Sequence, residues 1–208
     1  MLSVNIAVLV SGGGTNLQAL IDAQKRGELG RGEIKLVISN RKNAYALQRA
    51  ENNGIETAYV KMRRGDSACE NELLELLQKK GIDMLVLAGY LAILGENIIN
   101  AYRNRIINIH PSLIPSFCGM GYYGLKVHEA ALEYGVKVTG ATVHYVNEIA
   151  DGGKIFQNFH IAVNAAGGGV QMPFCAADPD IPVQGGADIQ QTAQGNAQGQ
   201  PEDALILF

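Results

Sequence analysis

Short runs of β-branched and other apolar residues alternate along the chain with segments of helical pattern. The runs occupy residues 5–10, 34–39, 56–60, 84–88 and 106–108. Strands that alternate with helices in this way are typical of a parallel sheet covered by helices on both faces. The pattern therefore predicts an α/β fold built on a mostly parallel sheet.

Local signals predict two further elements. A capping-box pattern at residues 67–70 precedes a stripe of leucines, and lysine and glycine at residues 79–81 mark its end. We expect a helix over residues 69–80. The valine- and threonine-rich segment 137–146 predicts another strand, and residues 147–153 follow it as a loop.

The chain changes character after Lys154. Residues 1–157 hold all 17 basic residues and 15 acidic ones, whereas residues 158–208 hold five acidic residues and no basic one. Glycine runs and a glutamine-rich stretch replace any sustained periodicity in the second segment. We predict an α/β domain over residues 1–157 and an acidic low-complexity tail over residues 158–208, loop-like or disordered from about residue 162.

Composition excludes several classes of function. With 208 residues, 47% of them hydrophobic, the chain can bury one substantial core. A net charge of −3 and the lack of any basic run argue against nucleic-acid binding. The apolar runs are far shorter than a membrane span of about 20 residues, and the N-terminus carries no secretory signal. We therefore expect a soluble cytoplasmic protein.

Three cysteines are spread widely through the sequence. Cys69, Cys118 and Cys175 fit neither a disulfide framework nor a Cys-x-x-Cys metal clip. We interpret them as reduced thiols. No base stands near Cys118 in the sequence to activate it as a nucleophile.

A glycine-rich turn follows the first predicted strand. It reads Ser-Gly-Gly-Gly-Thr-Asn-Leu-Gln over residues 11–18 and opens a helical segment. Glycines let backbone N–H groups approach an anion, and a helix start adds its positive end, so a phosphate suits this loop. NAD is not expected, because Leu17 replaces the third glycine of the dinucleotide fingerprint and Asn40 replaces its acid. A plain tight turn with an asparagine cap is the structural alternative.

A second group of polar residues lies at predicted strand ends. Asn108 and His110 stand two apart, so their side chains point the same way, and Asp151 lies on a later loop before two glycines. Open α/β folds bind ligands at the carboxyl ends of their strands. An amide, an imidazole and a carboxylate can hold an oxyanion and move a proton, which suits acyl transfer without a covalent nucleophile. The alternatives are a structural histidine and a turn aspartate; His144 can lie near this group, but a structural role is favoured.

Four motifs in the same order resemble the phosphoribosylglycinamide formyltransferase family. They are the loop at residues 11–18, Leu-Ala-Gly-Tyr-Leu-Ala-Ile-Leu at 87–94, Asn-Ile-His-Pro-Ser-Leu-Ile-Pro at 108–115, and Thr-Val-His with a later Asp-Gly-Gly between 142 and 153. The resemblance covers residues 6–157. It implies a Rossmann-like formyltransferase fold. It also implies transfer of the formyl group of 10-formyltetrahydrofolate to the amine of N1-(5-phospho-D-ribosyl)glycinamide, a step of de novo purine biosynthesis.

The resemblance also implies which residues bind and react. It implies small-molecule substrates, a monomer or a homodimer, and neither metal nor NAD. By position in the motifs, the catalytic residues are Asn108, His110 and Asp151, and the substrate phosphate lies on Gly14, Thr15 and Asn16. The walls of the folate pocket are Leu91, Ala92, Ile93, Leu94, Ile106, Asn108, Asn147, Glu148, Ile149 and Ala150, with His144 as a secondary residue.

Two features depart from the family pattern. Ala92 stands where many members carry arginine. In addition, residues 158–208 lack the strand and the amphipathic helix that end the family's domain, and we interpret them as foreign or frame-shifted sequence. The alternative function is therefore a catalytically impaired relative that still binds phosphate or folate.

Overall fold

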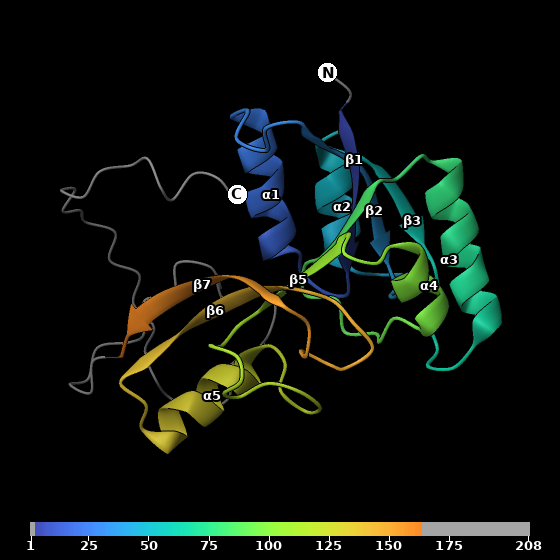
Figure 1. Cartoon of the computed structure of the whole chain (residues 1–208). Helices are drawn as coiled ribbons and strands as arrows, with labels where there is room; N and C mark the ends of the chain where they lie inside the picture. The colour runs from blue at the N-terminus through green and yellow to red at the C-terminus, as the bar shows by residue number, and fades with distance from the viewer. Residues whose placement is uncertain (1–2, 164–208) are drawn as a thin grey trace.

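One sheet organises the part of the chain that this computed structural model describes, residues 3–163 (Figure 1). Its strands are β1 (Val4–Val10), β2 (Gly32–Ser39), β3 (Glu56–Tyr59), β4 (Met84–Leu87), β5 (Ile106–His110), β6 (Val138–Tyr145) and β7 (Ile155–Ala162). They lie in the order β3-β2-β1-β4-β5-β6-β7. The first five strands of the chain are parallel, whereas β6 and β7 are antiparallel. The predicted α/β fold with a mostly parallel sheet is confirmed.

Helices cover both faces of the parallel strands. Within the described residues they are α1 (Thr15–Lys25), α2 (Tyr45–Asn52), α3 (Ser67–Lys79), α4 (Glu96–Ala101) and α5 (Leu125–Tyr134). In Figure 1, α1 and α2 flank β1 on one side, α3 and α4 lie on the other, and α5 lies apart, below β6. The central strands β1 and β4 are therefore enclosed between two helical layers, which explains their largely apolar sequences. Strand β3, at the edge of the sheet, has no buried residue.

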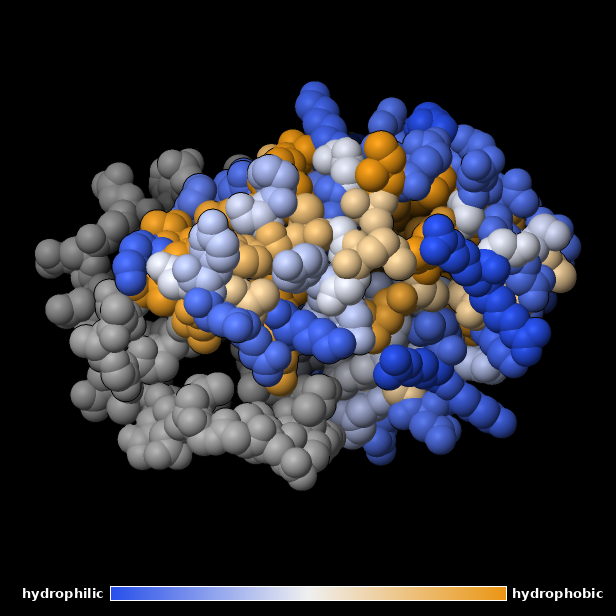
Figure 2. All heavy atoms as spheres, turned by 90° about the horizontal axis from the view of Figure 1, so that it is seen from below, coloured by the Kyte–Doolittle hydropathy of each residue, from blue (hydrophilic) through white to orange (hydrophobic). Residues whose placement is uncertain are grey.

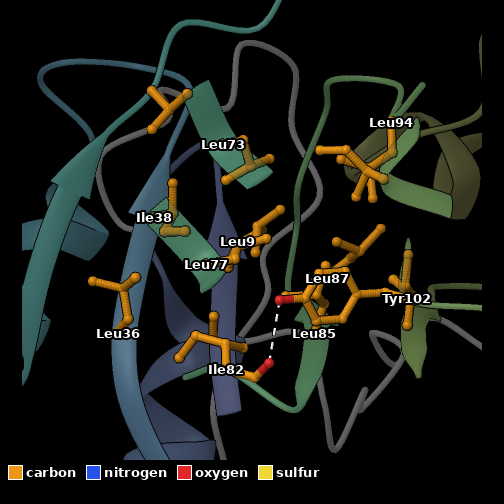
Figure 3. Packing of buried hydrophobic residues seen from close by; sticks show 14 of the residues in the cluster. Leu9, Leu36, Ile38, Leu73, Leu77, Ile82, Leu85, Leu87, Leu94 and Tyr102 are labelled. Atoms are coloured by element: carbon orange, nitrogen blue, oxygen red, sulfur yellow. Dashed lines mark hydrogen bonds between the residues drawn. The ribbon is translucent and has the colours of Figure 1, made fainter. Parts of the chain in front are cut away.

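The alternation of side chains along β1 divides the core into two clusters. Ala7 and Leu9 pack with leucines of α3, as Figure 3 shows for Leu9 beside Leu73 and Leu77. Val8 and Val10 point to the opposite face and pack with α1 and α2. On the α3 side, the buried hydroxyl of Tyr102 donates a hydrogen bond to the Ile82 carbonyl at 3.2 Å.

Helix α3 begins one residue earlier than its capping pattern suggested. Asp66, not Ser67, is the N-cap, and its carboxylate accepts hydrogen bonds from the N–H groups of Ala68 and Cys69 at 3.1 and 3.4 Å. The expected capping box with Glu70 is therefore wrong, and Glu70 is instead a buried side chain. The helix itself, predicted over residues 69–80, is confirmed as Ser67–Lys79.

The antiparallel pair extends past the domain boundary expected at residue 157. Strand β6 confirms the strand predicted at residues 137–146, and it pairs with β7 over the whole of β7. Because β7 continues to Ala162, the boundary at 157 falls inside a paired strand and is too early. The remainder of the predicted tail, with Cys175, lies outside the described residues.

The described residues can be compared with two expectations, one about the cysteines and one about membrane spans. Cys69 and Cys118 are free thiols, as interpreted from their spacing. Over residues 3–163, every helix is too short or too polar to cross a membrane.

Candidate active site

A cavity of about 470 Å³ opens at the carboxyl ends of the parallel strands. Its walls come from segments far apart in the sequence: residues 87 and 90–94 after β4, Asn108 on β5, residues 119–123, and residues 144 and 146–151 at the β6–β7 turn, with Arg41 after β2. Figure 2 views the molecule from this lower side and shows apolar side chains gathered there, bordered by polar ones. The cavity therefore combines segments that follow β2, β4, β5 and β6.

Asn108 and His144 lie side by side because β5 and β6 pair in register. The two residues are directly opposite partners in the antiparallel ladder. Nδ2 of Asn108 is 3.0 Å from Nε2 of His144, while Nδ1 of His144 is 3.0 Å from the Tyr145 carbonyl. Since a carbonyl oxygen only accepts, Nδ1 carries the proton and Nε2 of the neutral ring accepts from the Asn108 amide, an assignment made from the partners. Sequence reasoning favoured a structural role for His144, but the structure places it inside the cluster.

Asp151 reaches this pair from the turn between β6 and β7. Its Oδ1 is 3.7 Å from Nε2 of His144, and its Oδ2 is 3.6 Å from Nδ1 of His110. Oδ2 also accepts a hydrogen bond from the Gly119 N–H at 2.8 Å. One carboxylate therefore joins both histidines to the loop that follows β5.

The glycines after Asp151 are needed for that turn. Asp151 has a positive φ of 54°, an uncommon conformation for a non-glycine residue. At Gly153 a Cβ atom would lie 1.6 Å from the Tyr145 carbonyl oxygen, so no side chain fits there. The Asp-Gly-Gly motif therefore specifies a tight approach of the turn to β6, which aims the carboxylate inward.

His110 is buried next to Asp151 but is not among the residues that line the cavity. Only 4% of its surface is exposed. Its Nε2 is 3.0 Å from the Phe117 carbonyl oxygen, so Nε2 carries the proton and donates to that oxygen. The ring is thus held between the Asp151 carboxylate and the loop after β5.

Thr142 anchors the loop that leaves His110. It lies opposite His110 in the β5–β6 ladder. Its hydroxyl donates to the Ser112 carbonyl at 2.7 Å and accepts from the Ile114 N–H at 3.1 Å. Every polar atom of this buried threonine side chain is thereby satisfied, and the path of the chain after His110 is set by β6.

Two opposing effects act on the Asp151 carboxyl group. Burial alone would raise its pKa, but the neighbouring His144 side chain, the hydrogen bond from the Gly119 N–H and the electrostatic interaction with His110 outweigh burial and hold the pKa below its ordinary value. Asp151 is therefore ionised at neutral pH. For the Cys118 thiol, burial and then the Asp151 charge raise the pKa, so the thiol stays protonated and is a poor nucleophile.

The predicted phosphate loop has the geometry of an open helix start. Gly14 is the N-cap of α1 with φ 78°, and a Cβ atom there would lie 2.6 Å from Cβ of Ala46. Asn16 is inside the helix rather than at its cap, and within residues 3–163 no side chain caps α1. The alternative of an asparagine-capped turn is therefore wrong. The loop is a separate feature, because Gly14, Thr15 and Asn16 do not line the described cavity.

Helix α2 holds the carbonyl groups of this loop. The Gly12 carbonyl accepts from the Ala46 N–H at 3.1 Å, and the Gly13 carbonyl accepts from Nε of Arg49 at 2.8 Å. The Arg49 guanidinium also stacks over the Tyr45 ring at 4.9 Å. Sequence reasoning missed Arg49, because nothing in its local pattern links it to residues 36 positions earlier.

Nine of the ten residues predicted as folate-pocket walls line the cavity, and Ile106 does not. Ile106 is 1% exposed and packs in a core cluster. It lies two residues before Asn108 on β5, on the same face of the sheet but deeper in the core. The prediction also missed Arg41, Tyr90 and residues 119–123. The strand-end rule could have found Arg41, since it follows β2 directly.

His128 is half-buried on α5, and among the described residues its Nδ1 has no hydrogen-bond partner. Burial, and secondarily the nearby charge of His110, lower its pKa.

A family model described as formyl transferase matches residues 4–169. The chain belongs to the formyl transferase family. The match passes the expected limit at residue 157, in agreement with the longer β7. The resemblance found in the sequence is thereby confirmed.

Individual members of the formyl transferase family agree with this assignment. Phosphoribosylglycinamide formyltransferase of Escherichia coli is 39% identical over 164 residues, 78% of this chain and 74% of that protein. The chloroplastic phosphoribosylglycinamide formyltransferase of Arabidopsis thaliana is 39% identical over 163 residues, which are 77% of this chain but only 56% of that protein. The solved structure of glycinamide ribonucleotide transformylase 1 from Symbiobacterium toebii superposes with a TM-score of 0.71 at 40% identity, covering 78% of this chain and 74% of that chain.

Proposed function

We propose that this protein transfers the formyl group of 10-formyltetrahydrofolate to the amine of N1-(5-phospho-D-ribosyl)glycinamide. The observation that carries the proposal is the convergence of Asn108, His110, His144 and Asp151 at one end of a cavity with apolar walls. The names of the similar proteins from Escherichia coli and Arabidopsis thaliana agree with it. The reaction belongs to de novo purine biosynthesis and takes place in the cytoplasm.

The cavity supports binding of the folate cosubstrate. Leu91, Ile93 and Ile149 expose apolar side chains along its walls, which suits a flat heterocycle. The glycine-rich loop supports binding of the other substrate, because the first N–H groups of α1 and the side chains of Thr15 and Asn16 suit a terminal phosphate. The amine of that substrate then meets the formyl group between the two sites.

The side chains of the cluster supply the proposed chemistry. The substrate amine attacks the formyl carbon, and the Asn108 amide N–H and the Nε2–H of His110 stabilise the oxyanion of the tetrahedral intermediate. Such a donor contributes about 3–4 kcal/mol to the transition state. The ionised Asp151 accepts the amine proton, directly or through water, and returns this proton to the folate nitrogen as the bond between that nitrogen and the formyl carbon breaks.

The Phe117 carbonyl occupies the position on His110 that an oxyanion would take. Nε2–H of His110 donates to this carbonyl at 3.0 Å, so the same donor becomes available to the oxyanion only when the Phe117 carbonyl releases it. Phe117 itself has a positive φ of 49°. The proposed reaction therefore includes a rearrangement of the loop that follows Pro115.

A direct assay with both substrates tests the proposal. The whole protein is mixed with 10-formyltetrahydrofolate and glycinamide ribonucleotide, and the release of tetrahydrofolate is followed. We expect turnover that needs both substrates and falls by roughly 100-fold or more in His110→Ala, the usual range for loss of one acid–base or oxyanion group. Ligand binding without turnover in the wild-type protein would instead support the catalytically impaired alternative. His160→Ala, exposed on β7, is the matched control.

A further inference from the structure

A buried serine joins two loops of the proposed site. Ser11 follows β1 at the start of the glycine-rich loop, and only 1% of its surface is exposed. Its hydroxyl accepts a hydrogen bond from the Leu91 backbone N–H at 2.8 Å and donates one to Oδ1 of Asn40 at 2.6 Å. Loops that follow β1, β2 and β4 therefore meet at one oxygen atom.

Leu91 begins one wall of the cavity. The segment after β4 has no regular helix or strand before α4, and residues 90–94 line the pocket. Among the described residues, the Leu91 N–H is the only backbone group between residues 89 and 94 with a hydrogen bond, and its acceptor is Ser11. Tyr90 and Leu94 pack on the core cluster, whereas the side chains of Leu91 and Ile93 are exposed. Between these two packed residues, the serine hydroxyl therefore holds the position of the Leu91 backbone.

The glycine-rich loop does not depend on the same hydroxyl. Its Gly12 and Gly13 carbonyls are held by Ala46 and Arg49 of α2. Loss of the Ser11 hydroxyl leaves both of these contacts in place. Loss of the Ser11 hydroxyl should therefore affect the Leu91 wall and not the glycine-rich loop, although Ser11 belongs to the sequence motif of that loop.

We propose that Ser11 is a positioning residue for the folate, acting through the Leu91 segment. The inference rests on the proposed function of the cavity as the folate site. Ser11→Ala removes the hydroxyl that orders this wall, so folate binding weakens while the phosphate loop is preserved. Asn40→Ala has a smaller effect, because Ser11 Oγ can still accept from the Leu91 N–H.

The test compares three variants of the full chain. Tetrahydrofolate binding is measured by calorimetric titration, and the KM values for 10-formyltetrahydrofolate and glycinamide ribonucleotide are measured separately. The matched control is Tyr102→Phe, which also removes one buried hydrogen bond, to the Ile82 carbonyl in the core away from the cavity. This control reports any effect of lost stability alone.

Ser11→Ala should weaken tetrahydrofolate binding and raise the folate KM by about tenfold, the equivalent of one buried hydrogen bond. The KM for glycinamide ribonucleotide should change by less than about twofold, and Tyr102→Phe should resemble the wild type. Unchanged folate binding in Ser11→Ala, or equal losses for both substrates, would overturn the inference alone. A wild-type protein that binds no tetrahydrofolate would overturn the proposed function together with it.

Discussion

The parallel strands and the antiparallel pair use burial in different ways. The last four residues of β1, Ala7–Val10, are all apolar and fully buried. Strand β6 is buried along most of its length too, but Thr139, Thr142 and His144 are among its buried residues. In β7 no residue is fully buried. One side of the sheet is thus an apolar core, and the other side buries polar groups that face the site.

Because of this difference, we expect substitutions in one region to lower stability and substitutions in the other to lower activity. In the parallel region, buried side chains contact helices on both faces, so their removal leaves cavities. Where β5 pairs with the antiparallel strand β6, polar side chains have specific partners, as Asn108 has in His144 and His110 has in Asp151. Substitutions there should change activity more than stability, and the three predictions below test this separation.

Asp151→Asn should produce the largest effect. The amide keeps an acceptor for the Gly119 N–H but cannot take the amine proton, so kcat/KM should fall by about 10²- to 10⁴-fold, with Tm changed by only a few degrees. Because the carboxyl pKa lies below its ordinary value, the contribution of the carboxylate should persist through neutral pH and be lost only as the pH falls through that lowered pKa. Steady-state kinetics across pH measure both effects.

The control for this variant is Glu133→Gln, which neutralises an exposed carboxylate on α5. It should retain wild-type kinetics. Near-normal kcat/KM in Asp151→Asn would remove the carboxylate from the mechanism and with it the separation between the two regions.

Leu77→Ala should have the opposite profile. Leu77 is fully buried between α3 and the parallel strands, so its truncation should lower the free energy of unfolding by about 2–5 kcal/mol. Activity per folded molecule should remain, because Leu77 does not line the cavity. Urea unfolding monitored by circular dichroism measures the stability. Leu132→Ala, at a half-exposed position on α5, should cost less than about 1 kcal/mol; equal losses would show that the two regions do not differ.

His128→Gln should give the smallest effect. The pKa of His128 is lowered in the folded protein, so stability is complete above the unfolded value of about 6.5 and is lost as the pH falls below it. Glutamine cannot be protonated, and the fall in Tm between pH 7.5 and 5.5 should shrink by a few degrees. Thermal scans at several pH values test this, with the exposed His160→Gln as a control that should leave the fall unchanged.

Local and periodic features were readable from the residues. The central parallel strands β1 and β4 follow from largely apolar runs, because a strand enclosed by helices has no polar face. Helix α3 follows from its leucine stripe and its lysine-rich end. The glycines at 12–14 and 152–153 indicate sharp turns, and at Gly14, Gly152 and Gly153 a Cβ atom would clash with neighbouring atoms.

Partners across the sheet were not readable in the same way. The sequence placed Asn108, His110 and Asp151 at strand ends, but it did not show that His110 donates to Phe117 or that Arg49 supports the glycine-rich loop. Ile106 was assigned to the pocket wall by position in a motif, although its side chain lies in the core. Such contacts join residues on separate elements, and no local pattern encodes them.

The order of apolar and polar residues by itself determined the α/β architecture, the strand ends and the types of side chain at the site, because each follows from the conformation and solvation of neighbouring residues. Only the tertiary structure decided which groups share the cavity. The register of β5 on β6 sets Asn108 against His144, and the β6–β7 turn brings Asp151 to both histidines. The β5–β6 register and the position of the β6–β7 turn depend on packing between distant segments, so they exist only in the assembled sheet.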